Sequence, residues 1–586
     1  MTHSTRKQSL KQSLAGVGPG VRRSGRGWPL RPRRRRDFFN YAVYDVETKG
    51  KDSTEFEMIG FFDGETYTCF RDPEKFLAHV LVPKYHKWKI FAHYGGRYDV
   101  NFLFDLIRGT HPRWLIGIIF SGAACIAFTV KIGKGRWRFT DSFRLMPAGL
   151  ARLTQEFDVE HKKLAFDPTS ALYNEHDCRG LYEVLAKFFE LTGQRCITLA
   201  ATAMSIYRHN YQSRDLASVS DKVTDWIRLG YFGGRVETYR WDAATLNCYD
   251  VNSLYPYAML GPLPVRYDAG TRNIPDNDDK FIGFYEADVD YPELYIPSLP
   301  YMLLDSAEQK LYFPVGRFTG YFTSMELRQA ICDGARVKVR QGCQFHTEPI
   351  LRDYSLAIFK MKQDAEAAGQ PAIRFVAKIL LNALYGKFGQ RPEQETYICD
   401  PGTATLNPAD PDSPGIWPLP KGMAYYMQGS HAAHLLPHIA SAVTSRARLL
   451  MCDRLRRAGR IWYTDTDSIF TTKNLPTSNE MGDLRHEGRG LFQAHGLKEY
   501  QFKGVYALKG ISLRSDNLVE NDRKALDYLH GIPVTSLRMA GLKESIQRGE
   551  RAFRITPVTK VRRRRGEKRA RDGDDTRPWN VEELLK

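Results

Sequence analysis

Residues 461–472 combine two short apolar runs with a polar centre. They read IWYTDTDSIFTT, with aromatic and β-branched residues on both sides of the turn-forming Asp and Thr residues. This pattern predicts two strands joined by a tight turn. Because side chains alternate along a strand, Asp465 and Asp467 are expected to share one face of this hairpin.

Other apolar runs predict the elements around the hairpin. Residues 38–50 (FFNYAVYDVETKG) and 88–93 (WKIFAH) read as strands, with a turn at residues 63–64 between them. Residues 178–192 (CRGLYEVLAKFFELT) and 374–387 (RFVAKILLNALYGK) have the spacing of helices. Strands and helices in one chain favour the α/β class.

The length indicates several domains. A chain of 586 residues exceeds the usual single-domain range, so three to five compact units are expected. Hydrophobic residues make up 42% and aromatic residues 12% of the chain, which is enough for large cores. No apolar run is long enough to span a bilayer, and this predicts a soluble protein. The nine cysteines are scattered and never form Cys-x-x-Cys, which argues against a zinc ribbon or a disulfide framework and favours a reducing compartment.

The positive charge is concentrated at the two ends of the chain. Residues 1–36 carry +11 and residues 560–571 carry +7, which together equal the formal net charge of +18. We expect the first segment to be a basic disordered arm. A transit peptide and a nuclear-localisation signal are the alternatives, so the compartment stays open. The second segment is expected to contact nucleic acid without sequence preference, or to be simply solvated.

The acidic hairpin has two interpretations. Two carboxylates held close together repel each other, and this is costly unless a cation neutralises them. Hard Mg²⁺ prefers such oxygen ligands, so a divalent metal site is one interpretation. The other is a solvated acidic turn, because Asp and Thr are common in turns. The remaining motifs of the chain favour the metal site.

Four further carboxylates lie on separate predicted elements of the first 200 residues. Asp45 and Glu47 share one face of a strand, and Asp99 follows another strand. Asp177 stands four residues after Tyr173, one turn along the same helical face. Convergence of such acids suits a two-metal phosphodiester site, in which one cation generates hydroxide and the other stabilises the leaving oxygen.

This ordered set resembles the 3′–5′ exonuclease domain of family B DNA polymerases. That domain carries D-x-E, a second Asp after an aromatic residue, and Y-x-x-x-D in the same order. The resemblance implies a ribonuclease-H-like domain in which Tyr173 orients the attacking water and the metal ligands are Asp45, Glu47, Asp99 and Asp177. One departure is Tyr94, which stands where the family usually has an Asn that helps to hold the single-stranded 3′ end.

The segment DVNSLYP matches motif A of the same family, D-x-x-S-L-Y-P, at every fixed position. The resemblance implies that Asp250 is a metal ligand and that Val251 offers its carbonyl oxygen. It also implies that Ser253 and Leu254 contact the triphosphate through backbone amides. Tyr255 is expected to exclude a 2′-hydroxyl, which makes the substrate a deoxynucleotide.

Polar residues recur along one face of the predicted helix at 374–387, at Arg374, Lys378, Asn382 and Tyr385. The segment resembles motif B, K-x-x-x-N-S-x-Y-G, with Ala383 in place of Ser. The resemblance implies that Lys378 neutralises the incoming triphosphate and that Tyr385 packs on the nascent base pair. Arg374 and Asn382 are further nucleotide-binding candidates.

The hairpin itself resembles motif C, Y-x-D-T-D-S. Asp467 is then the second principal metal ligand, facing Asp250. Asp465 would support the site, and Tyr463 would position Asp467 or the primer. Motifs A, B and C follow the three exonuclease motifs in order, from Asp45 onward.

Two shorter motifs concern the DNA strands. Tyr231, Gly233 and Gly234 match a Y-x-G-G motif of the protein-primed branch, which links two domains and contacts the template; a turn before a strand is the alternative. The family also has a K-x-Y that grips the primer in the thumb.

Two pairs of residues fit that K-x-Y. Lys498 and Tyr500 fit the spacing, whereas Lys503 and Tyr506 fit the surrounding pattern with one extra residue. The sequence leaves both open.

The spacing of the motifs predicts how the domains are arranged. About 120 residues separate motifs A and B, and a second Pro- and Gly-rich insertion follows motif B. The protein-primed branch has insertions at both places, the first docking the terminal protein and the second encircling DNA. The expected divisions are a basic arm at 1–36, an exonuclease domain at 37–200, a linker and first palm segment at 201–261, a terminal-protein-region-like insertion at 262–352, fingers at 353–390, a second insertion at 391–428, the palm at 429–485, and the thumb with a basic tail at 486–586.

The sequence therefore predicts an α/β multidomain polymerase with an exonuclease domain and a right-hand palm, fingers and thumb. Its expected cofactor is Mg²⁺, two per active site, with Mn²⁺ as the alternative. Its expected partners are primer–template DNA, dNTPs and a terminal protein, and the chain is expected to be a monomer. One rival is a family B polymerase that extends ordinary primers. The other is a nuclease whose polymerase half only binds DNA, against which Asp250, Lys378 and Asp467 argue.

Overall fold

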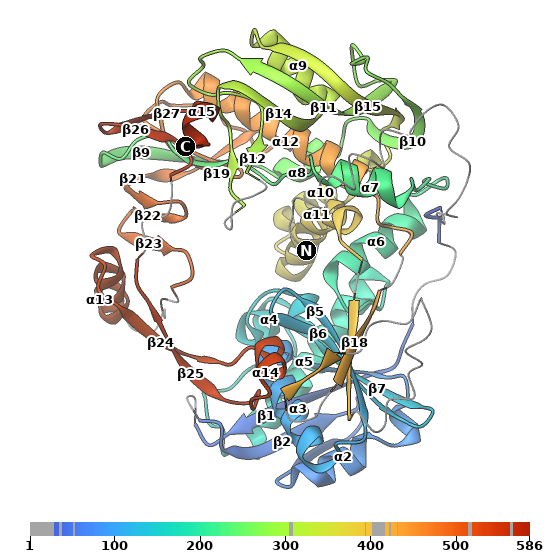
Figure 1. Ribbon diagram of the computed structural model, residues 1–586. Helices are drawn as coiled ribbons and strands as arrows, with labels where there is room; N and C mark the ends of the chain where they lie inside the picture. The colour runs from blue at the N-terminus through green and yellow to red at the C-terminus, as the bar shows by residue number, and fades with distance from the viewer. Residues whose placement is uncertain are drawn as a thin grey trace.

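A mixed β-sheet, an antiparallel β-sheet and a group of long helices organise the chain (Figure 1). The computed structural model describes residues 29–33, 38–50, 53–303, 309–392, 394–400, 417–420, 424–429, 432–511, 513, 518–562 and 567–585. Most of the expected basic arm lies outside the described residues. Within residues 29–33, Leu30 is buried and pairs with Leu216 in a β-bridge. The prediction of a disordered arm therefore does not hold for these five residues.

The first sheet has the strand order β17-β18-β16-β5-β6-β7-β4-β1-β2-β3. Val43 and Tyr44, adjacent on β1, belong to two different buried clusters, one on each side of the sheet. Because both faces are covered, β1 reads as a nearly continuous apolar run. The strands of its N-terminal part are β1 (Tyr41–Thr48), β2 (Phe56–Phe62), β3 (Tyr67–Phe70), β4 (Lys89–Ala92), β5 (Leu115–Ser121), β6 (Ala124–Ile132) and β7 (Gly135–Asp141).

Helices cover this sheet and lead toward the second half of the chain. The helix expected at 178–192 begins earlier, at Ala171, because the Ser170 hydroxyl caps it by accepting a hydrogen bond from the Tyr173 amide. The elements of this part are α2 (Pro73–Val80), η1 (Pro83–Tyr85), η2 (Gly95–Arg97), α3 (Asp99–Thr110), η3 (Ser142–Arg144), α4 (Leu150–Glu156), α5 (Ala171–Thr192), α6 (Leu199–Asn210) and α7 (Asp221–Arg228).

The second sheet has the order β23-β22-β21-β9-β20-β19-β8 and contains the predicted acidic hairpin. Its strands are β8 (Val236–Thr238), β9 (Ala244–Val251), β19 (Ile461–Asp465), β20 (Ser468–Thr471), β21 (Leu484–Gly496), β22 (Glu499–Phe502) and β23 (Val505–Leu508), and α8 (Leu254–Ala258) and α12 (Pro437–Ala458) pack nearby. The expected division between palm and thumb at 485 falls inside β21, which pairs with β9. The palm sheet therefore continues past that point.

The first insertion forms a sheet of its own, in the order β10-β15-β11-β14. Its elements are β10 (Leu263–Gly270), β11 (Phe281–Tyr291), β12 (Tyr301–Met302), β13 (Leu311–Tyr312), β14 (Gly316–Thr323), α9 (Ser324–Cys332) and β15 (Arg336–Glu348). Besides its strands, the insertion contains the helix α9. A capping box of Thr323 and Glu326 begins it, a signal that the sequence does carry.

The fingers region consists of α10 (Arg352–Ala367) and α11 (Pro371–Gly389). The second insertion follows, with β16 (Gln394–Cys399), β17 (Trp417–Pro418) and β18 (Ala424–Gly429). The resemblance implies that this insertion encircles DNA, which stays a prediction. Strand β16 pairs with β5, so the described strands extend the first sheet.

The C-terminal region bridges the two halves of the molecule. Its elements are α13 (Leu518–Leu529), β24 (Val534–Met539), α14 (Leu542–Arg548), β25 (Ile555–Lys560), β26 (Ala570–Asp572), β27 (Asp575–Arg577) and α15 (Val581–Leu584). The amide nitrogen of Asn101 on α3 donates to the carbonyl oxygens of Ala540 and Ala552, at 2.9 and 3.0 Å. This contact brings α14 beside α3 (Figure 1). Within the described part of the chain, every helix is too short or too polar to cross a membrane.

A buried ion pair joins the palm helix to the first insertion. The Arg448 guanidinium donates to Glu326 Oε1 at 2.6 Å, and both side chains are essentially inaccessible to solvent. Arg448 also donates to the carbonyl oxygens of Phe232 and Gly233. One side chain of α12 therefore holds both α9 and the segment that precedes β8.

Loss of Arg448 should be costly, because it leaves Glu326 charged and buried. We expect Arg448→Ala to lower the free energy of unfolding by about 3–5 kcal/mol, measured by chemical denaturation. Arg457→Ala is the matched control on the same helix, since Arg457 is 77% exposed in its pair with Asp453 and should lose only about 0–1 kcal/mol. Equal losses in the two variants would contradict this account.

Candidate functional site

The first acidic centre lies where β1, α3 and α5 meet. Asp45, Glu47 and Asp177 each direct one carboxylate oxygen into a group whose members lie within 4.8 Å of one another. Asp99 lies at the start of α3, and its Oδ1 accepts a hydrogen bond from the Val46 amide at 2.9 Å. The four acids predicted from separate elements thus converge around β1.

Burial and mutual repulsion make this centre electrostatically unfavourable. Burial and the charge of Asp177 raise the pKa of Asp45 to about 7. Burial and the charge of Asp45 raise the pKa of Glu47 to about 10, and the same two causes raise the pKa of Asp99 well above its usual range. Clustered oxygen donors that resist ionisation fit a divalent cation, whose charge removes the repulsion.

The sequence did not reveal two polar partners of these acids. The Lys163 ammonium donates to the Tyr173 hydroxyl at 2.7 Å and to the Asp177 carboxylate. The Asn174 amide donates to Asp45 Oδ2 at 3.1 Å. Asn174 directly follows Tyr173 on α5, and its position on that helix could have indicated its contact with Asp45. Lys163 lies in a loop without periodicity, so only the fold brings it to the acids.

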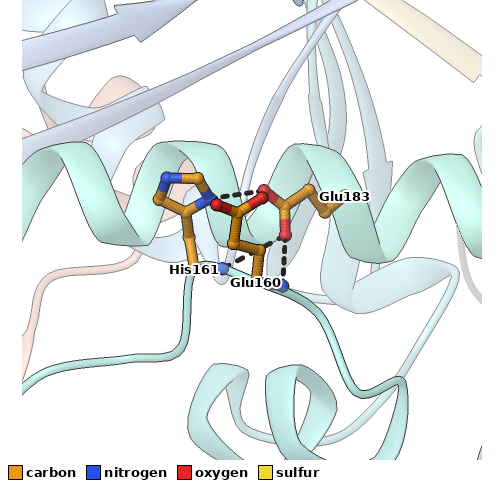
Figure 2. A group of neighbouring side chains, drawn as sticks. All are labelled: Glu160, His161 and Glu183. Atoms are coloured by element: carbon orange, nitrogen blue, oxygen red, sulfur yellow. Dashed lines mark hydrogen bonds and ion pairs between the residues drawn. The ribbon is translucent and has the colours of Figure 1, made fainter.

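A second group of titratable side chains holds the Lys163 loop on α5 (Figure 2). Glu183 Oε2 accepts the backbone amides of Glu160 and His161, at 2.9 and 3.2 Å. Glu183 Oε1 lies 2.5 Å from His161 Nδ1. Both oxygens of Glu183 are thus engaged within the protein, and the group serves as a brace for the loop rather than as a metal site.

Tyr94, the departure from the family pattern, lies near the first centre on a backbone of positive φ, 63°. Its ring is 44% exposed and stacks on Phe143, with ring centroids 4.0 Å apart and an interplanar angle of 28°. Where the family has a single amide, this chain presents two stacked rings. Such rings are suited to contact an unpaired base.

The second acidic centre lies on three adjacent palm strands. Asp250 on β9 is opposite Ser468 on β20, and the Val251 amide donates to the Asp467 carbonyl at 2.9 Å. Thr466 between the two acids of the hairpin has a φ of 63°, which makes the turn tight. Burial and the charge of Asp467 raise the pKa of Asp250 to about 7. Burial also raises the pKa of Asp467.

Asp465 makes different contacts from those of Asp250 and Asp467. Its carboxylate forms an ion pair with the Lys498 ammonium at 3.0 Å. The Lys498 amide donates to the hydroxyl of the buried Tyr463 at 2.8 Å, and the Tyr500 ring lies 5.2 Å from the Tyr463 ring. Lys498 and Tyr500 therefore adjoin the acidic hairpin.

The other pair that fits the K-x-Y motif, Lys503 and Tyr506, lies one strand farther along the same sheet, and its assignment to DNA binding stays a prediction. The Lys503 ammonium donates to the Glu487 carbonyl on β21 at 3.4 Å. Tyr506 packs against the small cluster around Leu508.

The helices α8 and α11 complete the second centre. Ser253 caps α8 with a φ of 60°, and Tyr255 stacks on Tyr385 of α11 at 4.6 Å and 18°. Lys378 is exposed on α11. Its charge lowers the pKa of Asp250, whereas burial and the charge of Asp467 have larger effects and raise it. The motif residues of three distant segments thus surround one acidic pair.

The remaining predicted residues lie around this group. Leu254 is buried in α8, Arg374 is half-buried, and the exposed Asn382 donates to the Lys378 carbonyl at 3.2 Å. The sequence did not identify Lys362, whose ammonium lies 3.3 Å from Asn252 Oδ1. The spacing of basic residues along α10 did not indicate that Lys362 lies near this group.

The Y-x-G-G segment packs between the hairpin and the fingers. A Cβ added at Gly234 would lie 2.8 Å from Thr466 Cγ2 and 3.2 Å from the Tyr255 hydroxyl, whereas Gly233 faces open space. Only Gly234 is therefore required for close approach. The hydroxyl of Tyr231 lies where a Cβ at Gly389 would be, at the end of α11.

The comparisons with known proteins agree with this geometry. A family model described as DNA polymerase type B, organellar and viral, matches residues 166–407. The DNA-directed DNA polymerase of Enterobacteria phage PRD1 is 26% identical over 490 residues, which cover 76% of this chain and 80% of that protein. The chain is therefore similar to DNA polymerases, and over residues 166–407 to those of type B.

Other relatives show how much of the chain is comparable. A probable DNA polymerase of Neurospora intermedia is 25% identical over 551 residues, covering 79% of this chain. The chain spans only 30–56% of the length of three fungal relatives. The solved structure of Phi29 DNA polymerase with primer-template DNA and incoming nucleotide has a TM-score of 0.68 at 15% identity, covering 89% of this chain and 99% of that one. The two chains share their fold.

The raised pKa of Asp45 predicts a pH-dependent cost in the metal-free protein. A folded-state pKa near 7, above the ordinary 3.8, means that stability falls as pH rises between these values. At pH 8 the folded protein bears a buried charge that Asn would remove. We expect Asp45→Asn to raise the free energy of unfolding by about 1–3 kcal/mol at pH 8 in EDTA, and by much less at pH 5.

Chemical denaturation at the two pH values measures this difference. The exposed Asp522 provides the control, since Asp522→Asn should leave the free energy of unfolding within about 0.5 kcal/mol at both. A stabilisation by Asp45→Asn that is the same at pH 5 and pH 8 would show that charge is not its cause.

Proposed function

We propose that the chain is a DNA-directed DNA polymerase with a 3′–5′ proofreading exonuclease, replicating a viral or plasmid-type DNA genome. The observation that carries the proposal is that Asp250, at the end of β9, lies beside Asp467, in the turn before β20: Asp250 pairs with Ser468, and the Val251 amide donates to the Asp467 carbonyl. The charge of Lys378 on α11 acts on Asp250. In the reaction, a primer 3′-oxygen attacks the α-phosphorus of a paired dNTP. A new O–P bond forms, the bond from the α-phosphorus to the bridging oxygen breaks, and pyrophosphate leaves.

Each residue of the second centre has a definite part in this reaction. Asp250, Asp467 and the Val251 carbonyl would hold Mg²⁺ or Mn²⁺, which supplies neutralisation of the developing charge when bound. Lys378 lies on the exposed face of α11 and neutralises the triphosphate as a point charge. The Tyr255 ring, fixed by its stack on Tyr385, forms the floor under the sugar and leaves no room for a 2′-hydroxyl.

The first centre supports the exonuclease activity. Asp45, Glu47 and Asp177 would hold the same class of cation, and the Lys163 ammonium orients the Tyr173 hydroxyl and balances Asp177. The stacked ring of Tyr94 takes over the grip on an unpaired 3′ end that an Asn provides elsewhere in the family.

Initiation from a terminal protein is part of the proposal. The first insertion forms a separate sheet beside the palm, joined to it through Arg448 and Glu326. Its position between motifs A and B supports a docking role for a protein primer. The relation to phage PRD1 and the Phi29 fold supports the same branch. A family B enzyme that extends ordinary primers is the alternative, and it would need no terminal protein.

Substitution of one acid in each centre should separate the two activities. Asp467→Ala is expected to lower primer extension by about 10³-fold or more, since several kcal/mol of charge stabilisation are lost at 1.36 kcal/mol per tenfold. Degradation of the primer should persist. Asp45→Ala should show the reverse. The measurement is gel analysis of a primed template with Mg²⁺, with and without dNTPs.

The same assay distinguishes the rival functions. A wild-type chain that degrades primers but never extends them would leave only the nuclease. Extension with no requirement for a terminal protein, at any origin tested, would favour the ordinary-primer enzyme.

The loop brace generates a further prediction. Glu183→Ala should release the loop that carries Lys163 and lower the exonuclease kcat by about 10–100-fold, the usual effect of losing an orienting partner. KM and primer extension should be unchanged. Glu183→Gln keeps one acceptor oxygen and should recover part of the rate.

Glu160→Gln is the matched control for this experiment. Its carboxylate takes no part in the hydrogen bonds of the brace, so the exonuclease rate should stay within twofold of wild type. If Glu160→Gln and Glu183→Ala lose the same activity, the effect comes from local charge and not from loop position.

A further inference from the structure

A cavity of about 260 Å³ lies behind the catalytic hairpin, between the palm sheet and the C-terminal segment. Its walls come from three parts of the chain: the end of β8 with Trp241, the turn between β21 and β22, and residues 567–571 with Arg562. β26 and β27 lie beside the palm strands on this side of the molecule (Figure 1). The Thr576 hydroxyl fixes them there by donating to the Tyr239 carbonyl at 2.9 Å.

Several hydrogen-bonding groups that line this cavity are buried and unsatisfied. Thr238 Oγ1, Trp241 Nε1 and Arg569 Nη1 have no hydrogen-bond partner among the described residues. Arg569 is only 1% exposed, and its Nε and Nη2 atoms are already used, by Thr576 and by the Tyr295 carbonyl. Each unsatisfied buried donor is costly, so an occupant that supplies acceptor oxygens is favoured.

The charges around the cavity leave a positive excess. Arg571 pairs with Glu567 at 3.0 Å, and Arg562 lies 3.7 Å from Glu499. The nearest acid to Arg569 is Glu237, at 3.8 Å.

Glu237 is engaged elsewhere. It is held more closely by Arg235, at 2.7 Å, and by the Tyr239 hydroxyl, while its Oε1 is unsatisfied. Arg569 therefore lacks a close counterion of its own.

Lys568 is the second cation that contributes to the positive excess of charge around the cavity. It lines the cavity, and its ammonium has no hydrogen bond or ion pair to any described residue. Burial lowers its pKa, while Glu237 and Asp465 act on it from a distance and raise the value. A half-buried ammonium with no partner in the described part of the chain is well placed to bind an anionic ligand.

The size and shape of the cavity restrict the ligand. A water molecule occupies about 30 Å³ in the liquid, so the space takes a phosphate group together with a few waters. Two cations and three unsatisfied donors match the charge and the several acceptor oxygens of a phosphate group. We propose that this cavity is a binding site for a phosphate group, held by Lys568 and Arg569.

The site is connected to the catalytic hairpin through its wall. Gly496 and Leu497 line the cavity, and the next residue, Lys498, pairs with Asp465 and donates to Tyr463. A bound phosphate would fix this turn and the C-terminal segment against the palm. The phosphate could belong to the DNA backbone or to a free compound such as inorganic phosphate or pyrophosphate. Residues 563–566 lie outside the described residues and form no part of the site.

Calorimetric titration of the full-length protein tests the proposal without any need for catalysis. Inorganic phosphate, pyrophosphate and a short primer–template duplex are titrated separately into wild type, Lys568→Gln and Thr238→Val. Lys75→Gln is the control, since Lys75 is an exposed lysine on α2, remote from the palm. Unfolding temperatures measured in parallel show whether each variant folds, and Thr238→Val preserves side-chain volume.

Two outcomes support the proposal and identify the source of the phosphate. A free-phosphate site gives measurable binding of phosphate or pyrophosphate that is about tenfold or more weaker in Lys568→Gln. A DNA-backbone site gives no such binding, but Lys568→Gln then weakens duplex affinity and reduces its salt slope by about one relative to Lys75→Gln. The proposal is overturned if all three titrations are the same in Lys568→Gln, Thr238→Val and Lys75→Gln. That result would leave the proposed function intact, because binding here and synthesis at Asp250 are measured separately.

Discussion

Repulsion between carboxylates held out of water is the constraint on which both halves of this chain depend. In one half the charge of Asp177 raises the cost of ionising Asp45 and Glu47, and in the other the charge of Asp467 does so for Asp250. No local preference of the chain favours this arrangement. It persists because sheets, helices and ion pairs around each centre over-determine the positions of the acids, at a cost in stability that is typical of functional sites.

The surrounding structure answers this cost with rigid connections. Arg448 joins α12 to the first insertion and to the Y-x-G-G segment. β16 adds to the sheet of the first centre while its neighbours in the chain, α11 and α12, build the second. The C-terminal region contacts α3 through Asn101 and returns to the palm at β27. Each centre is therefore braced by segments distant in sequence.

Much of the candidate site could be predicted from the sequence, because its acids lie in short motifs tied to local structure. The hairpin with Asp465 and Asp467, the strand with Asp45, and the helix with Tyr173 all have patterns that local rules interpret. The position of Lys163 beside the acids could not be predicted, since it lies in an aperiodic loop. The fold was predictable as a class but not in its long-range pairings, such as β16 with β5, which depend on partners nearly 300 residues apart. Motif spacing alone could not choose between Lys498 and Lys503, which lie immediately before and after β22.

The pairing of β16 with β5 also protects the protein against self-association. β5 reads LIGIIFS, and Ile116 and Ile118 are fully buried. Without the second insertion, the backbone of this strand would offer unpaired amides and carbonyls beside isoleucine side chains, the kind of edge onto which another chain adds. The insertion thus covers an edge of the sheet that would otherwise be exposed. A chain that lost the insertion would be prone to self-association even with both acidic centres intact.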